Sequence, residues 1–243
     1  MKLRADVALV ERGLASSRAQ AQALILAGRV FSAERRVEKA GEQIGQDVEL
    51  GVRGAPRFVS RGGDKLEGAL TDLEVDVRGA VVVDVGASTG GFTDCVLQHG
   101  AVKVYAVDVG HGQLAQKLRD DPRVVVMERT NARHLDARSF EEPVGLVVVD
   151  ASFIGIEKLM PAIAALSPSG ARLLALVKPQ FEAGRDAARR ARGVIRDPVV
   201  REAAITEARR AIEDAGFEIL GEHDSRLAGP KGNVERFVSA RRR

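Results

Sequence analysis

The sequence predicts an α/β fold in which a mostly parallel sheet, covered by helices on both faces, follows a small α+β domain. Beyond residue 80, near-continuous apolar runs alternate with helical patterns. Such runs are typical of strands that are buried on both faces of a parallel sheet. Residues 1 to about 50 lack this pattern and carry shorter helices and strands. A chain of 243 residues, 45% of them hydrophobic, can bury one large core or two unequal ones.

The small domain is expected to begin with two helices. Apolar residues over 7–14 have helical spacing, and Gly13 is placed to close that helix. Ser16 and Ser17 both offer a cap for a second helix over 18–27. Short strands are expected at 30–31 and 47–52. The glycine- and proline-containing joint 51–56 then predicts two domains, 1–55 and 56–243.

Seven strands are expected in the second domain. Their predicted ranges are 80–85, 102–108, 124–127, 146–150, 173–178, 217–220 and 237–240. A helix over about 199–215 precedes the last two. The composition therefore predicts a seven-stranded sheet with helices between the strands.

Composition excludes several classes of protein. The net charge is only +3, so local patches of charge must indicate any partner. The single cysteine, Cys95, cannot form an internal disulfide and suggests no metal cluster, which fits a reducing cytosol. The first ten residues lack the apolar segment of a secretory signal, and no apolar run approaches the ~20 residues of a membrane helix. We therefore expect a cytoplasmic protein without a membrane or metal partner.

A glycine-rich turn follows the first predicted strand of the sheet. The segment 84–93 reads Asp-Val-Gly-Ala-Ser-Thr-Gly-Gly-Phe-Thr, and it differs from both a P-loop and a G-x-G-x-x-G motif. Glycines there let the backbone approach a ligand, and the preceding acid suits a ligand with a cationic amine. These needs match the methionine part of S-adenosylmethionine. The expected cofactor contacts in this segment are Asp84, Gly86, Ser88, Thr89, Gly90, Gly91 and Phe92.

Two further residues are candidates for cofactor binding. Asp108 ends the second predicted strand, where an acid can bind ribose hydroxyls, and Asn131 could contact an adenine edge. Either residue could instead be an ordinary turn or helix cap.

Four ionisable residues stand where packing alone rarely places a charge. Asp150 and Lys178 end apolar strands, while Lys65 and Glu235 lie in glycine-containing segments. In α/β folds, ligands bind at the carboxyl ends of the strands. An acid and an amine in one crevice suggest proton handling, although salt-bridged strand ends would give the same pattern.

These motifs together closely resemble the haemolysin-A-like (TlyA) family of ribosomal RNA 2′-O-methyltransferases. The segment 12–30 resembles an S4 RNA-binding domain. The remainder resembles an FtsJ-type, Rossmann-like methyltransferase domain through 59–63, 86–93, 108–110, 150–154, 178–182 and 232–235. The resemblance implies S-adenosylmethionine as cofactor, ribosomal RNA or ribosomal subunits as partner, and a monomer.

By this resemblance, Lys65, Asp150, Lys178 and Glu235 match the family's Lys-Asp-Lys-Glu catalytic set. A ribose 2′-hydroxyl must lose its proton to attack a sulfonium methyl group, and a lysine can take that proton only if its pKa falls from ~10.4 toward neutrality. We assign Lys178 as base, Lys65 and Asp150 as the groups that orient hydroxyl and methyl, and Glu235 as the group that positions the lysine or the ribose. Asp150 is also expected at the cofactor.

RNA contacts are expected from arginines in both domains. The segment 184–193 has four arginines between two glycines and suggests an exposed loop that contacts phosphates once RNA is implied. The expected RNA-binding residues are Arg4, Arg18, Arg29, Arg61, Arg189, Arg190 and Arg192.

The target and two rival functions stay open at this stage. Family members methylate cytidines of 23S rRNA and some also of 16S rRNA, and the ending Arg241-Arg242-Arg243 resembles the shorter branch associated with 23S alone. One rival is a non-catalytic RNA-binding or ribosome-assembly protein. The other is a haemolysin, which the absence of an apolar membrane segment disfavours.

Overall fold

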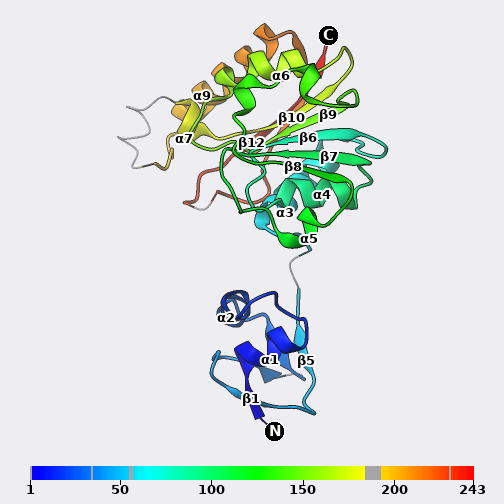
Figure 1. Ribbon diagram of the computed structural model, residues 1–243. Coiled ribbons are helices and arrows are strands. Elements are labelled where there is room, and N and C mark those ends of the chain that lie inside the picture. The colour runs from blue at the N-terminus through cyan, green and yellow to red at the C-terminus, as the bar shows by residue number, and fades with distance from the viewer. Residues whose placement is uncertain (1, 34, 55–56, 184–192, 230) are drawn as a thin grey trace. The chain divides into compact units, whose positions relative to one another are not determined.

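The computed structural model describes residues 2–33, 35–54, 57–183, 193–229 and 231–243 (Figure 1). The chain divides into two compact units, Met1–Arg57 and Phe58–Arg243. The predicted boundary after residue 55 lies two residues before this division.

Unit 1 (Met1–Arg57) contains two helices and two small antiparallel sheets. Its elements are β1 (Lys2–Arg4), α1 (Ala5–Glu11), α2 (Arg18–Leu26), β2 (Val30–Ser32), β3 (Arg35–Arg36), β4 (Gln43–Gly45) and β5 (Leu50–Val52). Strand β1 pairs with β4, and β2 lies between β3 and β5. Ser17 caps α2 as predicted, because its side chain accepts the backbone N–H of Gln20.

A buried carboxylate ties the start of unit 1 to α2. Asp6 is fully buried, and its oxygens accept hydrogen bonds from Arg4 at 3.0 Å, Arg18 at 3.0 Å and Gln22 at 3.0 Å. The Arg4 guanidinium holds the pKa of the Asp6 carboxyl well below its usual range, against the opposing effect of burial. The charge therefore stabilises unit 1 from inside.

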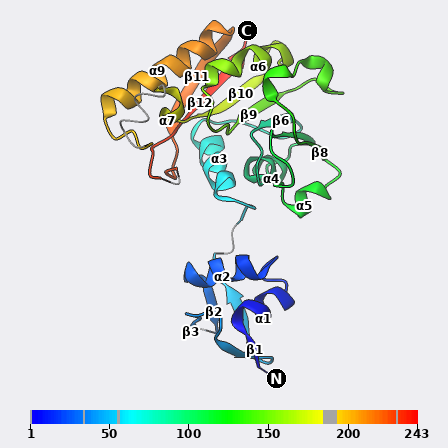
Figure 2. The same ribbon diagram turned by 60° about the vertical axis from the view of Figure 1, so that its left-hand side comes forward.

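Unit 2 (Phe58–Arg243) is built on a seven-stranded sheet with the order β11-β12-β10-β9-β6-β7-β8 (Figures 1 and 2). Its strands are β6 (Val81–Val85), β7 (Lys103–Val107), β8 (Val124–Met127), β9 (Leu146–Val149), β10 (Arg172–Val177), β11 (Phe217–Asp224) and β12 (Arg236–Arg242). The strands from β6 to β10 run parallel, and β12 runs antiparallel to β10 and β11. The predicted mostly parallel, seven-stranded α/β fold is confirmed.

Helices cover both faces of this sheet, as Figure 1 shows. On one face, apolar residues of α3 (Arg61–Asp72), α4 (Gly91–Gln98) and α5 (Gln116–Arg119) pack against the strands. The other face is covered by α6 (Met160–Leu166) and α9 (Pro198–Asp214). The remaining elements are α7 (Pro179–Glu182) and the 3₁₀ turns η1 (Ala132–His134), η2 (Ala137–Ser139) and η3 (Ile156–Lys158). Burial on both faces explains why the central strands read as continuous apolar runs.

The last two strands are longer than predicted. Strand β11 continues past Leu220 to Asp224, and β12 runs from Arg236 to Arg242. The register shifts between Ile219 and Gly221, and the polar residues that follow still pair with β12. Because β11 is an edge strand, its last residues can carry charged side chains. The hydrophobic pattern of the sequence therefore does not reveal the full length of the strand. Among the described residues, no helix is long and apolar enough to cross a membrane.

Replacing Asp6 by Asn should destabilise unit 1 by about 2 kcal/mol, because the charge-assisted hydrogen bonds to two guanidinium groups are lost. Since the folded pKa of Asp6 is depressed, its contribution is present above the ordinary carboxyl pKa and is lost as pH falls below it. Hydrogen exchange of unit 1 amides, followed in the full chain as the pH is lowered, measures the loss of stability in the variant and the pH dependence of stability in the wild type.

The control is Asp76→Asn, which removes an exposed ion pair with Arg78 in unit 2. Equal exchange rates in wild type and the Asp6→Asn variant at pH 7 would show that the buried carboxylate does not stabilise unit 1.

Candidate active site

A cavity of about 990 Å³ opens where three parallel strands of unit 2 end. Gly86 follows β6, Asp150 follows β9 and Lys178 follows β10. The cavity is lined by Ser60, Arg61, Gly62, Lys65, Gly86, Ala87, Ser88, Thr89, Gly91, Phe92, Asp150, Ser152, Phe153, Lys178, Gln180, Phe181, Gly193, Lys231, Asn233 and Glu235. Its position is the usual ligand site of an open α/β sheet, and its size is at the upper end of about 300–1,000 Å³ for small-molecule sites.

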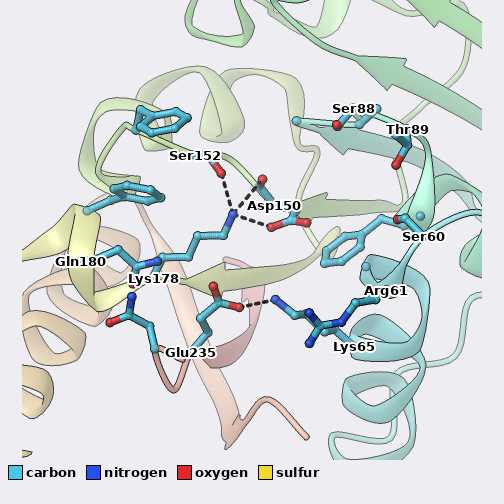
Figure 3. Close-up of a pocket in the computed structure, with 18 of the residues that line it drawn as sticks. Ser60, Arg61, Lys65, Ser88, Thr89, Asp150, Ser152, Lys178, Gln180 and Glu235 are labelled. Atoms are coloured by element: carbon cyan, nitrogen blue, oxygen red, sulfur yellow. Dashed lines mark hydrogen bonds and ion pairs between the residues drawn. The ribbon is translucent and has the colours of Figure 1, made fainter. Parts of the chain in front are cut away.

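The side chain of Lys178 is buried and held by two neighbours (Figure 3). Its Nζ lies 2.7 Å from Asp150 Oδ1 and 2.9 Å from Ser152 Oγ. The contact arises because β9 and β10 pair in parallel with Val149 opposite Ala175, so both strands end at the same edge. Asp150 and Ser152, both from the segment after β9, thus hold the Lys178 ammonium group at the wall of the cavity.

A second lysine–carboxylate pair faces the first across the cavity (Figure 3). Lys65 comes from the first turns of α3, and its Nζ lies 2.5 Å from Glu235 Oε2. The two side chains are only 9% and 2% exposed, so each charge depends on the other for compensation. Glu235 was expected to position a lysine or the ribose, and the lysine that it contacts is Lys65.

The structure therefore brings the four predicted catalytic residues together from positions up to 170 residues apart. Two buried ammonium groups and two carboxylates form separate pairs, so the charges of these four side chains compensate one another. Such a set can orient a hydroxyl group and move its proton.

The glycine-rich turn gives close access to the backbone at one side of this cavity. Gly86 has φ +88°, and a Cβ there would lie 3.0 Å from the Asp150 carbonyl oxygen. A Cβ on Gly91 would lie 2.2 Å from Ser60 Oγ. Ser88 also takes a left-handed backbone, with φ 48°. Glycine at positions 86 and 91 therefore lets the turn pack closely against the segment after β9 and against Ser60. A contact of the turn with the methionine end of S-adenosylmethionine stays a prediction.

Asp84 lies beneath the turn and does not line the cavity. Its side chain is fully buried, and Thr93 Oγ1 donates to Asp84 Oδ2 at 2.6 Å. Oδ1 has no hydrogen-bond partner among the described residues. Burial raises the pKa of Asp84 to about 7. A direct contact to the cofactor amine was expected, whereas the observed position supports the turn from below.

Other predicted cofactor residues lie beside the cavity rather than in its lining. Asp108 accepts the backbone N–H groups of Ser88 at 2.8 Å and Gly110 at 2.7 Å, which ties the turn after β6 to the one after β7. Asn131 caps η1 by accepting the N–H of Arg133. A Cβ on Gly90 would meet Leu118, so this glycine permits close packing on α5. Their contacts to a cofactor remain predictions.

The predicted RNA-binding arginines have different environments. Arg4 and Arg18 bind the buried Asp6 with guanidinium groups that remain about half exposed. The Arg61 guanidinium donates to the Ala228 carbonyl at 3.1 Å, and the residue lines the cavity. Arg29 lies beside Gly54 in unit 1. A Cβ added to Gly54 would lie 3.2 Å from the Arg29 guanidinium. Arg189, Arg190 and Arg192 lie outside the described residues.

Two phenylalanines that had no predicted role form one wall of the cavity. Phe153 is 91% exposed with φ 67°, and its ring centroid lies 5.2 Å from that of Phe181. Lys178 Nζ lies 6.0 Å from the Phe181 centroid. The Ile156 N–H donates to the Glu182 carboxyl at 3.0 Å, which joins the segment after β9 to α7.

These residues could have been found from their position in the sequence. Phe153 follows Asp150 by three residues and Phe181 follows Lys178 by three, so each is carried to the cavity by the strand that ends there. Among the described residues, no group of three or more His, Cys, Asp or Glu side chains could hold a metal ion.

Comparisons with known proteins give one consistent result. The model of FtsJ-like methyltransferases matches residues 58–242, and that of S4 domains matches residues 3–50. The chain is 47% identical to a candidate rRNA methyltransferase, YqxC, of Bacillus subtilis, over 96% of this chain and 84% of that protein. It is 43% identical to the 16S/23S rRNA (cytidine-2′-O)-methyltransferase TlyA of Mycobacterium tuberculosis, over 98% and 89%.

Comparison with solved structures agrees with these sequence matches. A candidate hemolysin from Streptococcus thermophilus matches with 40% identity and a TM-score of 0.77, over 99% of this chain and 88% of that one. S-adenosylmethionine-dependent methyltransferases at 14% and 17% identity share the fold alone, with TM-scores of 0.57 and 0.52.

Replacing Asp84 by Asn should flatten the pH dependence of stability. The pKa of Asp84 is higher in the folded state than its ordinary value of 3.8. The contribution of the protonated carboxyl to stability is therefore fully present below pH 3.8 and is lost as the pH rises toward about 7. The variant keeps the Thr93 hydrogen bond without a charge, so its advantage over wild type should grow by roughly 1.4 kcal/mol per pH unit at most across that window. Urea unfolding at pH 5, 6, 7 and 8 measures it.

The exposed Asp47→Asn substitution controls for the loss of one charge. Parallel stability profiles for wild type and Asp84→Asn would contradict the burial of a titrating carboxyl.

Proposed function

Because the chain belongs to the FtsJ-like methyltransferase family and carries an S4 domain, we propose that it methylates the ribose 2′-hydroxyl of a cytidine in ribosomal RNA, with S-adenosylmethionine as methyl donor. The observation that carries the proposal is the pairing of Lys178 with Asp150 and of Lys65 with Glu235 in one cavity beside the glycine-rich turn. The relative from Mycobacterium tuberculosis, whose name states this reaction, supports the substrate.

S-adenosylmethionine, when bound, supplies an electrophilic methyl group on sulfonium sulfur. The turn 86–91 would hold it, with Gly86 allowing close approach of the backbone and Ser88 and Thr89 offering hydroxyl groups to the cavity. Asp108 would act at the same end by holding the Ser88 backbone in place.

Lys178 takes the 2′-hydroxyl proton in this proposal. The ribose oxygen forms its new bond to the methyl carbon while the carbon–sulfur bond breaks, and the hydroxyl proton moves to Nζ, which has first given a proton of its ammonium group to solvent. Asp150 and Ser152, within 2.9 Å of that nitrogen, receive the resulting ammonium without further movement. Lys65 is placed by Glu235 to orient the hydroxyl from the opposite side.

The aromatic wall supports a nucleotide as substrate. An exposed phenylalanine with a left-handed backbone is costly for a folded chain, and such strain is typical of functional sites. The Phe153 and Phe181 rings beside Lys178 offer a stacking surface for a base whose ribose reaches the lysine.

We propose 23S rRNA as the main target, since the names of the relatives from Mycobacterium tuberculosis and Campylobacter jejuni both include it, and 16S rRNA as a second one, since the former name also includes 16S. Mass-spectrometric mapping of ribose methylation in both RNAs, with and without the protein, tests this. Binding to ribosomal subunits without any new methyl group would favour the non-catalytic assembly role instead. Lysis of red cells by the purified protein, independent of cofactor, would favour the haemolysin.

Replacing Lys178 by Ala should reduce methyl transfer at least about 1,000-fold, because proton removal from the hydroxyl is lost. The Kd for S-adenosylmethionine should change little, since the glycine-rich turn is untouched. Single-turnover transfer of a radiolabelled methyl group to unmodified subunits, with calorimetry of cofactor binding, measures both. Lys158→Ala, an exposed lysine on η3, is the control. Turnover by Lys178→Ala near the wild-type rate would contradict the assignment.

Replacing Phe153 by Ala should lower kcat/KM about tenfold, the order expected for one lost base-stacking contact. Cofactor affinity should stay at the wild-type level. Steady-state transfer to ribosomal subunits measures the change, and Val199→Ala, another exposed apolar residue, is the matched control. Equal losses in the two variants would argue against a stacking role.

A further inference from the structure

The segments that follow β9 and β10 contact each other at three points along the wall of the cavity. The first point is the Lys178 ammonium group, held by the segment after β9 as described above. The second is the contact between the Phe153 and Phe181 rings. The third is a carboxyl group that the proposed reaction does not use: both oxygens of Glu182 accept the Ile156 N–H, at 3.0 and 3.2 Å. Phe153 thus lies between two points at which its segment is tied to the start and to the end of α7.

Phe153 depends on such contacts for its position. Its backbone is left-handed, with φ 67°, and its side chain is 91% exposed. A residue other than glycine keeps a conformation of this kind only where its surroundings hold it. Because so little of the side chain is buried, packing contributes little to holding it. The hydrogen bonds of the neighbouring residues must therefore do so.

Glu182 supplies the contact on the C-terminal side of Phe153. The 3₁₀ turn η3 begins three residues after Phe153, and its N-cap residue, Gly155, has no side chain to cap it. Ile156, the first residue of the turn, is buried, so its N–H needs an acceptor from elsewhere in the fold. The Glu182 carboxyl is that acceptor. It thereby fixes the place at which η3 begins and the course of the chain from Phe153 to Ile156.

Fold stability alone does not account for a carboxyl group at this position. Burial raises the pKa of Glu182 to about 7, against the effect of the Ile156 hydrogen bond, and the Glu157 carboxylate acts in the same direction as burial. A serine or aspartate at position 155 would cap η3 locally without burying an acid. In either protonation state, Glu182 keeps an oxygen that accepts an N–H group. The residue therefore serves as a cap that reaches across from the segment that carries Lys178 and Phe181.

We propose that Glu182 is a positioning residue for methyl transfer, which holds Phe153 at the cavity by capping η3 through the Ile156 N–H group. The inference rests on the proposed function, in which the Phe153 ring stacks on the base of the target nucleotide. Glu182 itself does not line the cavity, so it acts on the substrate only through Phe153.

The test compares two substitutions at this position in the full chain. Glu182→Ala removes the acceptor, and kcat/KM for transfer to ribosomal subunits should fall about tenfold, as for the loss of the stacking residue itself. Glu182→Gln keeps an oxygen for the Ile156 N–H and should stay within about threefold of wild type. The Kd for S-adenosylmethionine should be unchanged in both. Glu157→Ala, which removes an exposed carboxylate from η3, is the matched control and should keep the wild-type rate.

The decisive measurement is the double variant with Phe153→Ala. If Glu182 acts through Phe153, adding Glu182→Ala to Phe153→Ala should cost less than about a further twofold, because the residue that it positions is already gone. General damage to the fold would instead multiply the two losses. A multiplied loss overturns the inference, and so does a Glu182→Gln variant as slow as Glu182→Ala. A weaker Kd for S-adenosylmethionine in Glu182→Ala would place the residue at the cofactor and overturn it as well.

Hydrogen exchange separates this inference from the proposed function, because it needs no methyl transfer. In the free protein, the Ile156 amide should exchange about tenfold faster in Glu182→Ala than in wild type, since its hydrogen bond is lost. Unchanged exchange overturns the inference, while ribose methylation by wild type would leave the proposed function standing. If wild type methylates no ribose in either rRNA, the proposed function fails, and the role of Glu182 in the reaction fails with it.

Discussion

The parallel pairing of β6, β9 and β10 is the constraint on which the site depends. Because these strands are neighbours that run in the same direction, the residues that follow each of them meet at one edge of the sheet. That edge receives the open turn at Gly86, the carboxylate of Asp150 and the ammonium of Lys178. The strands themselves are apolar and covered on both faces, so the ends are where polar groups can reach a ligand.

Compensation of buried charge explains the internal arrangement of the site. Lys65 and Glu235 are nearly inaccessible, and their ion pair compensates the charge that each would otherwise bury alone. The same rule holds in unit 1, where Asp6 is buried but contacted by two arginines and a glutamine. In unit 1 the arrangement stabilises a fold, whereas in the cavity it holds two amines where the proposed substrate hydroxyl would bind.

Two buried oxygens near the cavity depart from this rule, because they have neither a hydrogen bond nor an ion pair among the described residues. Asp84 Oδ1 lies under the glycine-rich turn, and Gln180 Oε1 lies at the opposite end of the cavity. Their environments give them different meanings. The raised pKa of Asp84 lets the carboxyl carry a proton of its own, while the carboxamide of Gln180 cannot change its charge.

The sequence alone determined the central parallel strands, the glycine-rich turn and the charges at the strand ends, because continuous hydrophobicity and its interruption are local properties. It placed Asp150 and Lys178 at one edge, since both end parallel strands. Only the tertiary structure decided that Lys65 and Glu235 join them as a pair, because α3 and the β11–β12 segment reach the cavity through packing that no local pattern encodes. The same packing buried Asp84 and gave Asn233 its hydrogen bonds, since hydrogen-bond partners distant in sequence are set by the fold.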